Sequence, residues 1–310
     1  MNLNNILKFS ITGLIIFLLG SLIAKHQDDL THLKNISTVQ FSLISFLIIG
    51  SIITNGMKLR ALAGSFNIRL DIKEILGLSS ITTCLNNFFF KSGSLFTSNY
   101  LKRRYEFSFM FFVGSQGADH LVSFFINALC GLIISSIYLI SEKGVFLTLS
   151  LVYLTIAVAL GLIFSKTFDL QNRSNKYLNA LTRAVNSLYI IIKNKPLLYT
   201  LCFFNLFSVA LNTLRLFLVC KVLGLGIPFG YCLLFITLLP FISAIPIIQS
   251  DIGTRELIVG VFSQWLGVSF EAGMLATLLD RCFIIFISII IALFYRNLLA
   301  SPKYAKPTAH

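Results

Sequence analysis

Long apolar stretches separated by short polar loops dominate the chain. These stretches cover residues 11–24, 41–53, 145–164, 197–219 and 283–294. Each lies within a window of about 20 residues, the length of helix that crosses the hydrocarbon core of a bilayer. The ten-residue alternation of a membrane β-barrel is missing, and closed barrels are the only other structures that satisfy their backbone hydrogen bonds in lipid. The pattern therefore predicts an all-α polytopic membrane protein with about six spanning helices.

The composition agrees, because 56% of the 310 residues are hydrophobic and 12% are charged. That is too little polar material to cover a soluble globule. The first apolar helix, residues 6–24, has a long hydrophobic region preceded only by Lys8, so we expect it to be retained rather than cleaved as a signal peptide. The six cysteines show no CxxC spacing and are typical of packing residues, so neither a metal site nor a cofactor is indicated.

The net charge of +13 would suggest a nucleic-acid partner in a soluble protein, but here Lys and Arg gather in a few short loops. This is the positive-inside pattern of membrane proteins, so we expect no nucleic-acid partner. The clearest case is the loop 166–196, where the basic side chains face only Asp169. The parts expected on the cytoplasmic side are both termini and residues 58–74, 91–105 and 166–195.

A shorter apolar segment, residues 75–90, is expected to dip into the membrane and return to the cytoplasmic side. Basic residues follow it at Lys91 and at 102–104, and basic residues also precede it, so a full crossing would contradict one flank. The polar tip of this segment contains Thr82, Thr83, Asn86 and Asn87. Such backbone is tolerated at membrane depth only where protein or a water-filled cavity surrounds it.

Residues 231–266 are expected to form a second re-entrant segment, which enters from the outside. Pro240 and Pro246 would break its first arm, and residues 250–255 would form a polar apex. Two such segments from opposite faces are what an inverted repeat would produce, and secondary transporters place substrate sites at these discontinuities. No repeat is visible in the sequence, so the symmetry is a hypothesis drawn from hydropathy alone.

The apolar stretch 107–140 is too long for a straight crossing at about 1.5 Å per residue. We expect a break at 114–119, which would leave 121–140 as the span. Within the loop 166–196, residues 178–192 show helical periodicity and are expected to lie along the inner surface. The chain would form a single integral membrane domain over residues 1–310, with an N-terminal half at 1–165 and a C-terminal half at 197–310.

Ionisable residues at membrane depth are candidates for function, because insertion of each charge costs roughly 3 kcal/mol. One cluster contains Asp251, Gly253, Arg255 and Glu256. Here Arg255 would hold a phosphate in bidentate fashion, and Glu256 would either orient that arginine or open a helix at its N-terminus. The alternative is an interfacial loop in which the arginine and the glutamate pair with each other.

Further candidates lie in the last span and in the first re-entrant segment. Asp280 and Arg281 are adjacent and point about 100° apart on a helix, so each needs another partner. Either Arg281 faces the cavity or both residues take part in structural pairs. The head-group candidates of the first re-entrant segment are Asn86, Asn87 and Gly93, with basic residues beside them. Asp119 and His120 form either a proton relay or an ordinary satisfied polar pair.

With these residues in place, the chain resembles the lysylphosphatidylglycerol synthase transmembrane family. The match is sharpest at residues 246–256, where the family has a proline, a glycine-rich stretch and then Gly-x-Arg-Glu. Gly253, Arg255 and Glu256 fit that ending, and Arg281 fits the pattern of the last span. Gln249, Ser250 and Asp251 stand where the family usually has a proline and glycines.

The resemblance implies a flippase-like protein of a bacterial inner membrane, without the soluble aminoacyl-transferase domain. Its ligand would be an anionic phospholipid or a polyprenyl-linked or glycosylated lipid of envelope biogenesis, and envelope-synthesis enzymes would be its partners. We expect Arg255 and Arg281 to bind the anionic head group. The chain carries no HExxH, GxSxG or P-loop motif, so we expect no enzyme. An ion-coupled carrier of a small solute and a structural partner of envelope-synthesis enzymes remain as alternatives.

Overall fold

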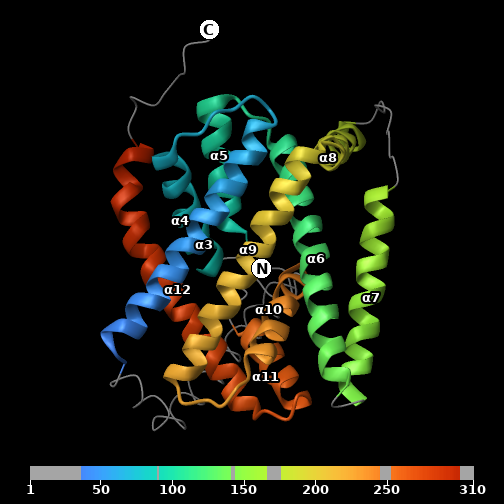
Figure 1. Cartoon of the computed structure of the whole chain (residues 1–310). Coiled ribbons are helices and arrows are strands. Elements are labelled where there is room, and N and C mark those ends of the chain that lie inside the picture. The colour runs from blue at the N-terminus through green and yellow to red at the C-terminus, as the bar shows by residue number, and fades with distance from the viewer. Residues whose placement is uncertain (1–35, 89–90, 141–143, 166–175, 245–252, 301–310) are drawn as a thin grey trace, which may run out of the picture.

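The computed structural model describes residues 36–88, 91–140, 144–165, 176–244 and 253–300. Within these ranges the chain forms ten helices: α3 (Thr38–Gly64), α4 (Ile72–Phe88), α5 (Ser92–Tyr105), α6 (Phe109–Leu139), α7 (Gly144–Ser165), α8 (Lys176–Lys193), α9 (Lys195–Val222), α10 (Phe229–Ala244), α11 (Thr254–Trp265) and α12 (Phe270–Ala300). Most of their axes run between the upper and the lower end of a bundle (Figure 1). The all-α fold predicted from the apolar pattern is confirmed.

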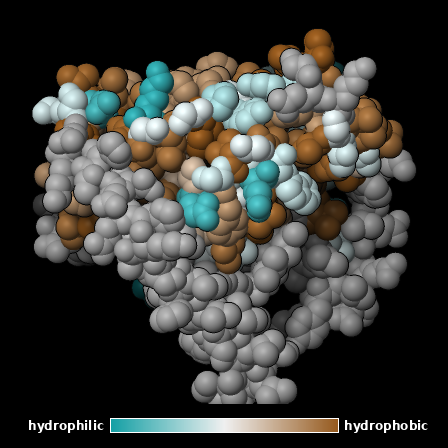
Figure 2. All heavy atoms as spheres, turned by 90° about the horizontal axis from the view of Figure 1, so that it is seen from below, coloured by the Kyte–Doolittle hydropathy of each residue, from teal (hydrophilic) through white to brown (hydrophobic). Residues whose placement is uncertain are grey.

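Five of the described helices, α3, α6, α7, α9 and α12, are long and apolar enough to cross a membrane. They contain the predicted spans, apart from the first apolar helix at 6–24, which lies outside the described residues. Large apolar side chains such as Phe46, Leu154 and Phe203 are exposed along them. Seen from the lower end, the described surface shows apolar residues with hydrophilic ones between them (Figure 2). Exposed apolar side chains along the long helices fit a lipid environment better than water.

α4 and α5 form a helical hairpin whose open ends both lie at the upper end of the bundle (Figure 1). Each is too short to cross about 30 Å of hydrocarbon at 1.5 Å per residue. The predicted re-entrant segment is thus present, but its boundaries were wrong, because the hairpin also includes α5 and Lys91 lies at the start of α5 rather than on a cytoplasmic flank. The low hydrophobicity of α5 concealed its place in the bundle.

Close packing and polar contacts hold the two arms of this hairpin together. The hydroxyl groups of Thr82 and Thr97 lie 2.6 Å apart, and the Asn86 side chain accepts a hydrogen bond of 2.8 Å from the Gly93 amide. A Cβ atom on Gly93 would overlap the Thr82 carbonyl group. Gly93 therefore serves the packing of α5 against α4, which requires a residue without a side chain.

At its open end the hairpin is anchored by a buried carboxylate. Glu74 of α4 accepts hydrogen bonds from Tyr100 and Tyr105 of α5, at 2.7 and 2.8 Å, and forms an ion pair of 3.2 Å with Arg104. Burial, followed by the hydrogen bond to Glu74, raises the pKa of both tyrosines, so their hydroxyl groups stay protonated as donors. Arg104, which the sequence placed in a basic run near the head groups, has this internal role.

α10 and α11 lie side by side with both open ends at the lower end (Figure 1). Their directions fit the predicted second re-entrant segment, and the two hairpins enter the bundle from opposite ends. The predicted break at Pro240 is wrong, because α10 continues through it to Ala244. A proline inside a membrane helix is tolerated where neighbouring groups compensate for the lost hydrogen bond. The predicted apex, including Pro246 and Asp251, lies largely outside the described residues.

α6 is one continuous helix through residues 114–119, so the break predicted there is wrong. Gly114, Ser115 and Asp119 are buried, and the polar groups that suggested a break instead face the interior. The extra length of α6 reaches the upper end, where α8 packs against it at a steep angle (Figure 1). The helix expected at 178–192 is confirmed as α8, while the orientation of the bundle in the membrane stays a prediction.

Gly93→Ala should loosen the α4–α5 hairpin, because the added methyl group meets the Thr82 carbonyl. We expect a loss of about 1–3 kcal/mol, the usual cost of overpacking, seen as a lower unfolding temperature in detergent. Gly161→Ala in α7 is the matched control, since nothing lies within 4 Å of its added Cβ. Alanine should be neutral or stabilising there. Equal unfolding temperatures for Gly93→Ala and the wild type would contradict the packing described.

Candidate functional site

Two adjoining polar cavities lie between the hairpins. The larger, of about 490 Å³, is lined by residues of α3, α4, α5, α6 and α10, and the smaller, of about 310 Å³, also reaches α9, α11 and α12. The residues common to both are Asn55, Lys58, Thr83, Ser123, Pro240 and Ser243. These shared walls join the two cavities into one polar space inside an otherwise apolar bundle.

A ring of three polar side chains lies where the two cavities meet, with Asp119 lining the larger, Asn205 the smaller and Lys58 both. Lys58 of α3 lies 3.1 Å from Asp119 of α6 and donates a hydrogen bond of 3.2 Å to Asn205 of α9. Asn205 in turn donates to the other carboxylate oxygen of Asp119 at 2.9 Å. The Lys58 and Asp119 side chains are each 12% exposed. Burial of this pair is tolerated because every charged atom has a partner.

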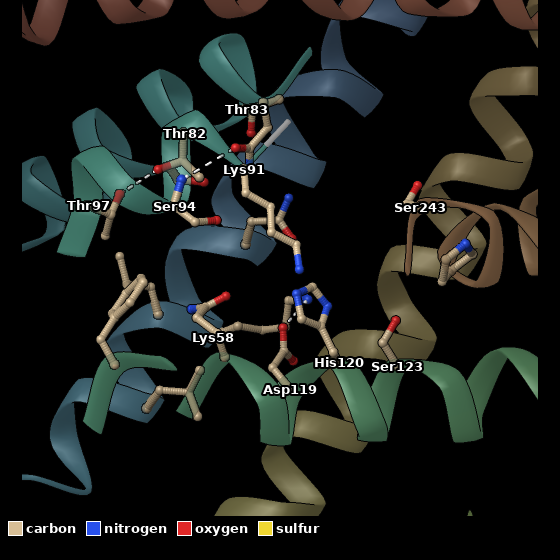
Figure 3. A pocket seen from close by; sticks show the side chains of 18 of the residues that line it. Lys58, Thr82, Thr83, Lys91, Ser94, Thr97, Asp119, His120, Ser123 and Ser243 are labelled. Atoms are coloured by element: carbon tan, nitrogen blue, oxygen red, sulfur yellow. Dashed lines mark hydrogen bonds and ion pairs between the residues drawn. The ribbon is translucent and has the colours of Figure 1, made fainter. Parts of the chain in front are cut away.

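The position of Lys58 corrects the sequence interpretation, which placed it in a cytoplasmic loop with other basic residues. α3 continues to Gly64, so Lys58 lies on the helix and faces the cavity. Figure 3 shows that Lys58, Lys91, Asp119 and His120 point into the same space. His120 also stacks on Phe124, with ring centroids 6.3 Å apart. The hypothesis of a proton relay through Asp119 and His120 stays open at this point.

One carboxylate, Asp280 of α12, is shared by two arginines at the smaller cavity. Arg215 of α9 holds it in bidentate fashion, at 2.6 and 3.1 Å, and also donates to Asn212 at 2.8 Å. Arg255 of α11 lies 3.7 Å from the same carboxylate. The Arg255 Nε is buried and has no hydrogen-bond partner among the described residues. Arg215 is thus held firmly, whereas Arg255 retains donors for another group.

Sequence analysis missed Arg215, although an arginine within the apolar stretch 197–219 is itself a signal of function or pairing. Asp280 has the helix partner that the sequence required, and Arg215 is that partner. The second interpretation of the adjacent pair, in which Asp280 and Arg281 both take part in structural pairs, is the one that the structure bears out.

Glu256 and Arg281 connect the two hairpins through α12. Gly253 begins α11 with a φ of +89°, a conformation that favours glycine, and its amide donates to Glu256 at 2.7 Å. The other oxygen of Glu256 lies 2.9 Å from Arg281, which also donates to the Asn87 carbonyl at 3.2 Å. Glu256 therefore opens a helix, as one interpretation held. Its expected contact with Arg255 is wrong, because α11 directs it toward Arg281.

The structure brings only part of the predicted site to the cavity walls. Asn86 lines the larger cavity, and Asn87 and Arg255 line the smaller one. The remaining described candidates, Gly93, Gly253, Glu256 and Arg281, are not among the lining residues and instead shape the backbone or pair internally. Asp251 lies outside the described residues. The head-group role of Arg281 stays a prediction, which its pairing with Glu256 and its place outside the cavity walls do not favour.

The walls of the joined cavities are cationic. Their described lining residues include four cations against one carboxylate, namely Lys58, Lys91, Arg215 and Arg255 against Asp119. Charges exert stronger fields in a low-dielectric interior than in water, so this excess favours an anionic guest. No group of three His, Cys, Asp or Glu side chains in the described part of the chain is placed to hold a metal ion.

Apolar helices around a polar, cationic centre between opposed hairpins define a polytopic membrane protein with an internal site for a charged group. The chain belongs to the family described as the lysylphosphatidylglycerol synthase TM region, whose family model matches residues 5–292. The resemblance expected from the Gly-x-Arg-Glu motif is thus confirmed. This family is a membrane domain of envelope lipid-related proteins, which is compatible with a lipid-related role. The chain matches no curated protein.

The pairing of Glu256 with Arg281 can be tested with a double-mutant cycle. The two single variants are Glu256→Gln and Arg281→Gln. Glu256→Gln keeps an acceptor for the helix start but leaves Arg281 without its counter-ion, and Arg281→Gln leaves Glu256 without its own. Each should lower the free energy of unfolding by about 3–5 kcal/mol. The double variant should lose much less than the sum, measured by unfolding in detergent. Glu256→Gln combined with Arg255→Gln is the comparison and should be closer to additive. Full additivity for Glu256 and Arg281 would disprove the pairing.

Proposed function

We propose that this protein binds an anionic lipid and moves its head group through the membrane by way of the joined cavities. The observation that carries the proposal is the cationic lining of a polar space inside an apolar bundle. Such charges are costly in a membrane unless they have partners or a function. Family membership supports a lipid as the substrate.

The dimensions of the cavities support a head group rather than a whole lipid. At about 490 and 310 Å³ the cavities fall in or near the usual range of small-molecule sites. They have room for a phosphate with its polar substituent, while the acyl or polyprenyl chains would remain in the bilayer. The exposed apolar side chains of the long helices offer those chains a compatible surface.

In this proposal Arg255 is the residue that holds the phosphate. Its contact with Asp280 is long at 3.7 Å, and its Nε has no partner among the described residues, so the guanidinium fork can donate hydrogen bonds to two phosphate oxygens. Arg215 keeps Asp280 in place and maintains the field without leaving its own bidentate pair. Lys58 and Lys91 would attract the same anion from the side of the larger cavity.

The proposal covers binding and transport without catalysis, in a bacterial inner membrane and in the service of envelope synthesis. A carrier of small solutes is the second candidate, since opposed short hairpins and a polar cavity would serve it equally well. The two are separated by competition. If the protein transports lipid and the acyl chains contribute to binding, a water-soluble anion in large excess should leave lipid translocation nearly unchanged. If the protein carries solutes, it should transport the water-soluble anion and should not translocate the lipid.

The test is translocation of fluorescently labelled phosphatidylglycerol in proteoliposomes. Arg255→Ala should slow translocation about 10- to 100-fold, the equivalent of one or two charge-assisted hydrogen bonds. Arg255→Lys should also be slow, because an ammonium group does not reproduce the planar fork. Arg103, an exposed residue in the last turn of α5, provides the matched control, and both Arg103→Ala and Arg103→Lys should keep the parental rate.

Each variant is first checked for folding by its unfolding temperature. Folded Arg255 variants that translocate lipid at the parental rate would show that Arg255 is only a structural partner of Asp280. Equal loss in the Arg103 variants would show that general surface charge, rather than the cavity, controls the rate.

A further inference from the structure

We propose that Asp119 takes up one proton when the anionic head group binds, so that lipid binding is coupled to protonation. This inference rests on the proposed function and adds the coupling ion to it. It starts from the ring of Lys58, Asp119 and Asn205. Lys58 is the one member of this ring that lines both cavities, and it is a cation.

The lysine is the movable member of this ring. Its ammonium group is a point charge on a flexible stem, so it can turn from one anion to another. Asp119 and Asn205 are held more firmly, because Asn205 donates to Asp119 at 2.9 Å and to the Leu201 carbonyl at 2.9 Å. An arriving phosphate therefore competes with Asp119 for Lys58, and the lysine follows the phosphate while the carboxylate stays.

Departure of Lys58 leaves the Asp119 carboxylate with one amide partner in a buried position. The residue as a whole is 8% exposed. A buried carboxylate without a counter-ion becomes neutral by taking a proton, here from the buffered bulk solution. The balance is simple: one proton binds to Asp119, Lys58 stays protonated, and its charge is now paired with the phosphate. A monoanionic head group and one proton thus enter together without a change in net charge.

The pair of Arg215 and Asp280 does not offer this exchange. Asp280 is fully buried, does not line either cavity and is held by two arginines. Release of one guanidinium group would leave it paired with the other. Among the described lining residues, Asp119 is the one carboxylate, and its single cationic partner is the group that the substrate attracts.

The groups packed around Asp119 leave its carboxylate as the best proton acceptor. On the remaining sides α8 and α9 present apolar residues, including Leu188, Ile191 and Leu201. α10 contributes Ser243 to the cavity, and α7 contacts α6 nearby through Phe164 and Phe125.

Two further ionisable groups face the same space, His120 on α6 and Lys91 at the start of α5. Both become more positive on protonation. Of the two, His120 is the competing proton acceptor, because histidine is the side chain that takes up a proton near neutral pH. His120 therefore requires its own variant in the test.

The experiment is isothermal titration calorimetry on the full chain in mild detergent, with dihexanoyl phosphatidylglycerol as the probe. Titrations in two buffers of different ionisation enthalpy give the number of protons bound with the probe. We expect about one proton per bound head group, and an affinity that falls about tenfold for each rise of one pH unit, as linkage requires. His120→Gln should still take up about one proton.

Asp119→Asn should bind the probe without proton uptake, and more tightly than the wild type at high pH because Lys58 has no competing carboxylate. Binding by the wild type without proton uptake would overturn the inference alone. So would uptake that persists in Asp119→Asn and disappears in His120→Gln. No binding by the folded wild type would overturn the proposed function and this inference with it. The wild-type titration decides the matter even if Asp119→Asn does not fold.

Discussion

Inside an apolar bundle a charged side chain needs a counter-ion, because an unpaired charge at the bilayer centre costs roughly 3 kcal/mol or more. In this protein that requirement decides which helices meet. The pairs are Lys58 with Asp119, Arg215 with Asp280, and Glu256 with Arg281. They join α3 to α6, α9 to α12 and α11 to α12. Since one carboxylate serves two arginines at the smaller cavity, the same pairs also leave the cavity walls with excess positive charge.

The two short hairpins explain why a polar space exists at all. Helices that cross the whole bilayer would pack their apolar faces together, whereas α4, α5, α10 and α11 end within the bundle and bring their polar ends inward. Arg281 ties these ends together through Glu256 on one hairpin and the Asn87 carbonyl on the other. A displacement of either hairpin would therefore displace the other, as transport through a fixed central site requires.

Much of the fold could be predicted from hydropathy, because long apolar runs in a membrane have few alternatives to spanning helices. The errors arose where polarity had two explanations. Polar residues in α6 suggested a break, yet α6 is continuous and these residues face the interior of the bundle. Lys58 was assigned to a loop although it pairs with Asp119. α5 was overlooked because its polar groups form hydrogen bonds with α4, and these contacts are not visible in the linear sequence.

The candidate site was predicted in its chemistry but not in its pairings. The motif ending in Arg255 and Glu256 does lie at the start of a helix, and Arg255 does reach a cavity. Which acid meets which arginine depends on the rotation of α11 and α12 about their axes, and sequence spacing alone does not determine that rotation. Arg215 was missed for a different reason, since it stands alone in an apolar stretch and belongs to no local motif.

The most direct test of an anionic-lipid site is the identity of the lipids that co-purify with the full chain in mild detergent. Mass spectrometry would compare these lipids with a total extract of the same membranes. We expect enrichment of an anionic phospholipid or a phosphate-bearing polyprenyl lipid with the wild type, and loss of that enrichment in folded Arg255→Ala. A lipid composition equal to that of the extract, unchanged by the substitution, would contradict the account.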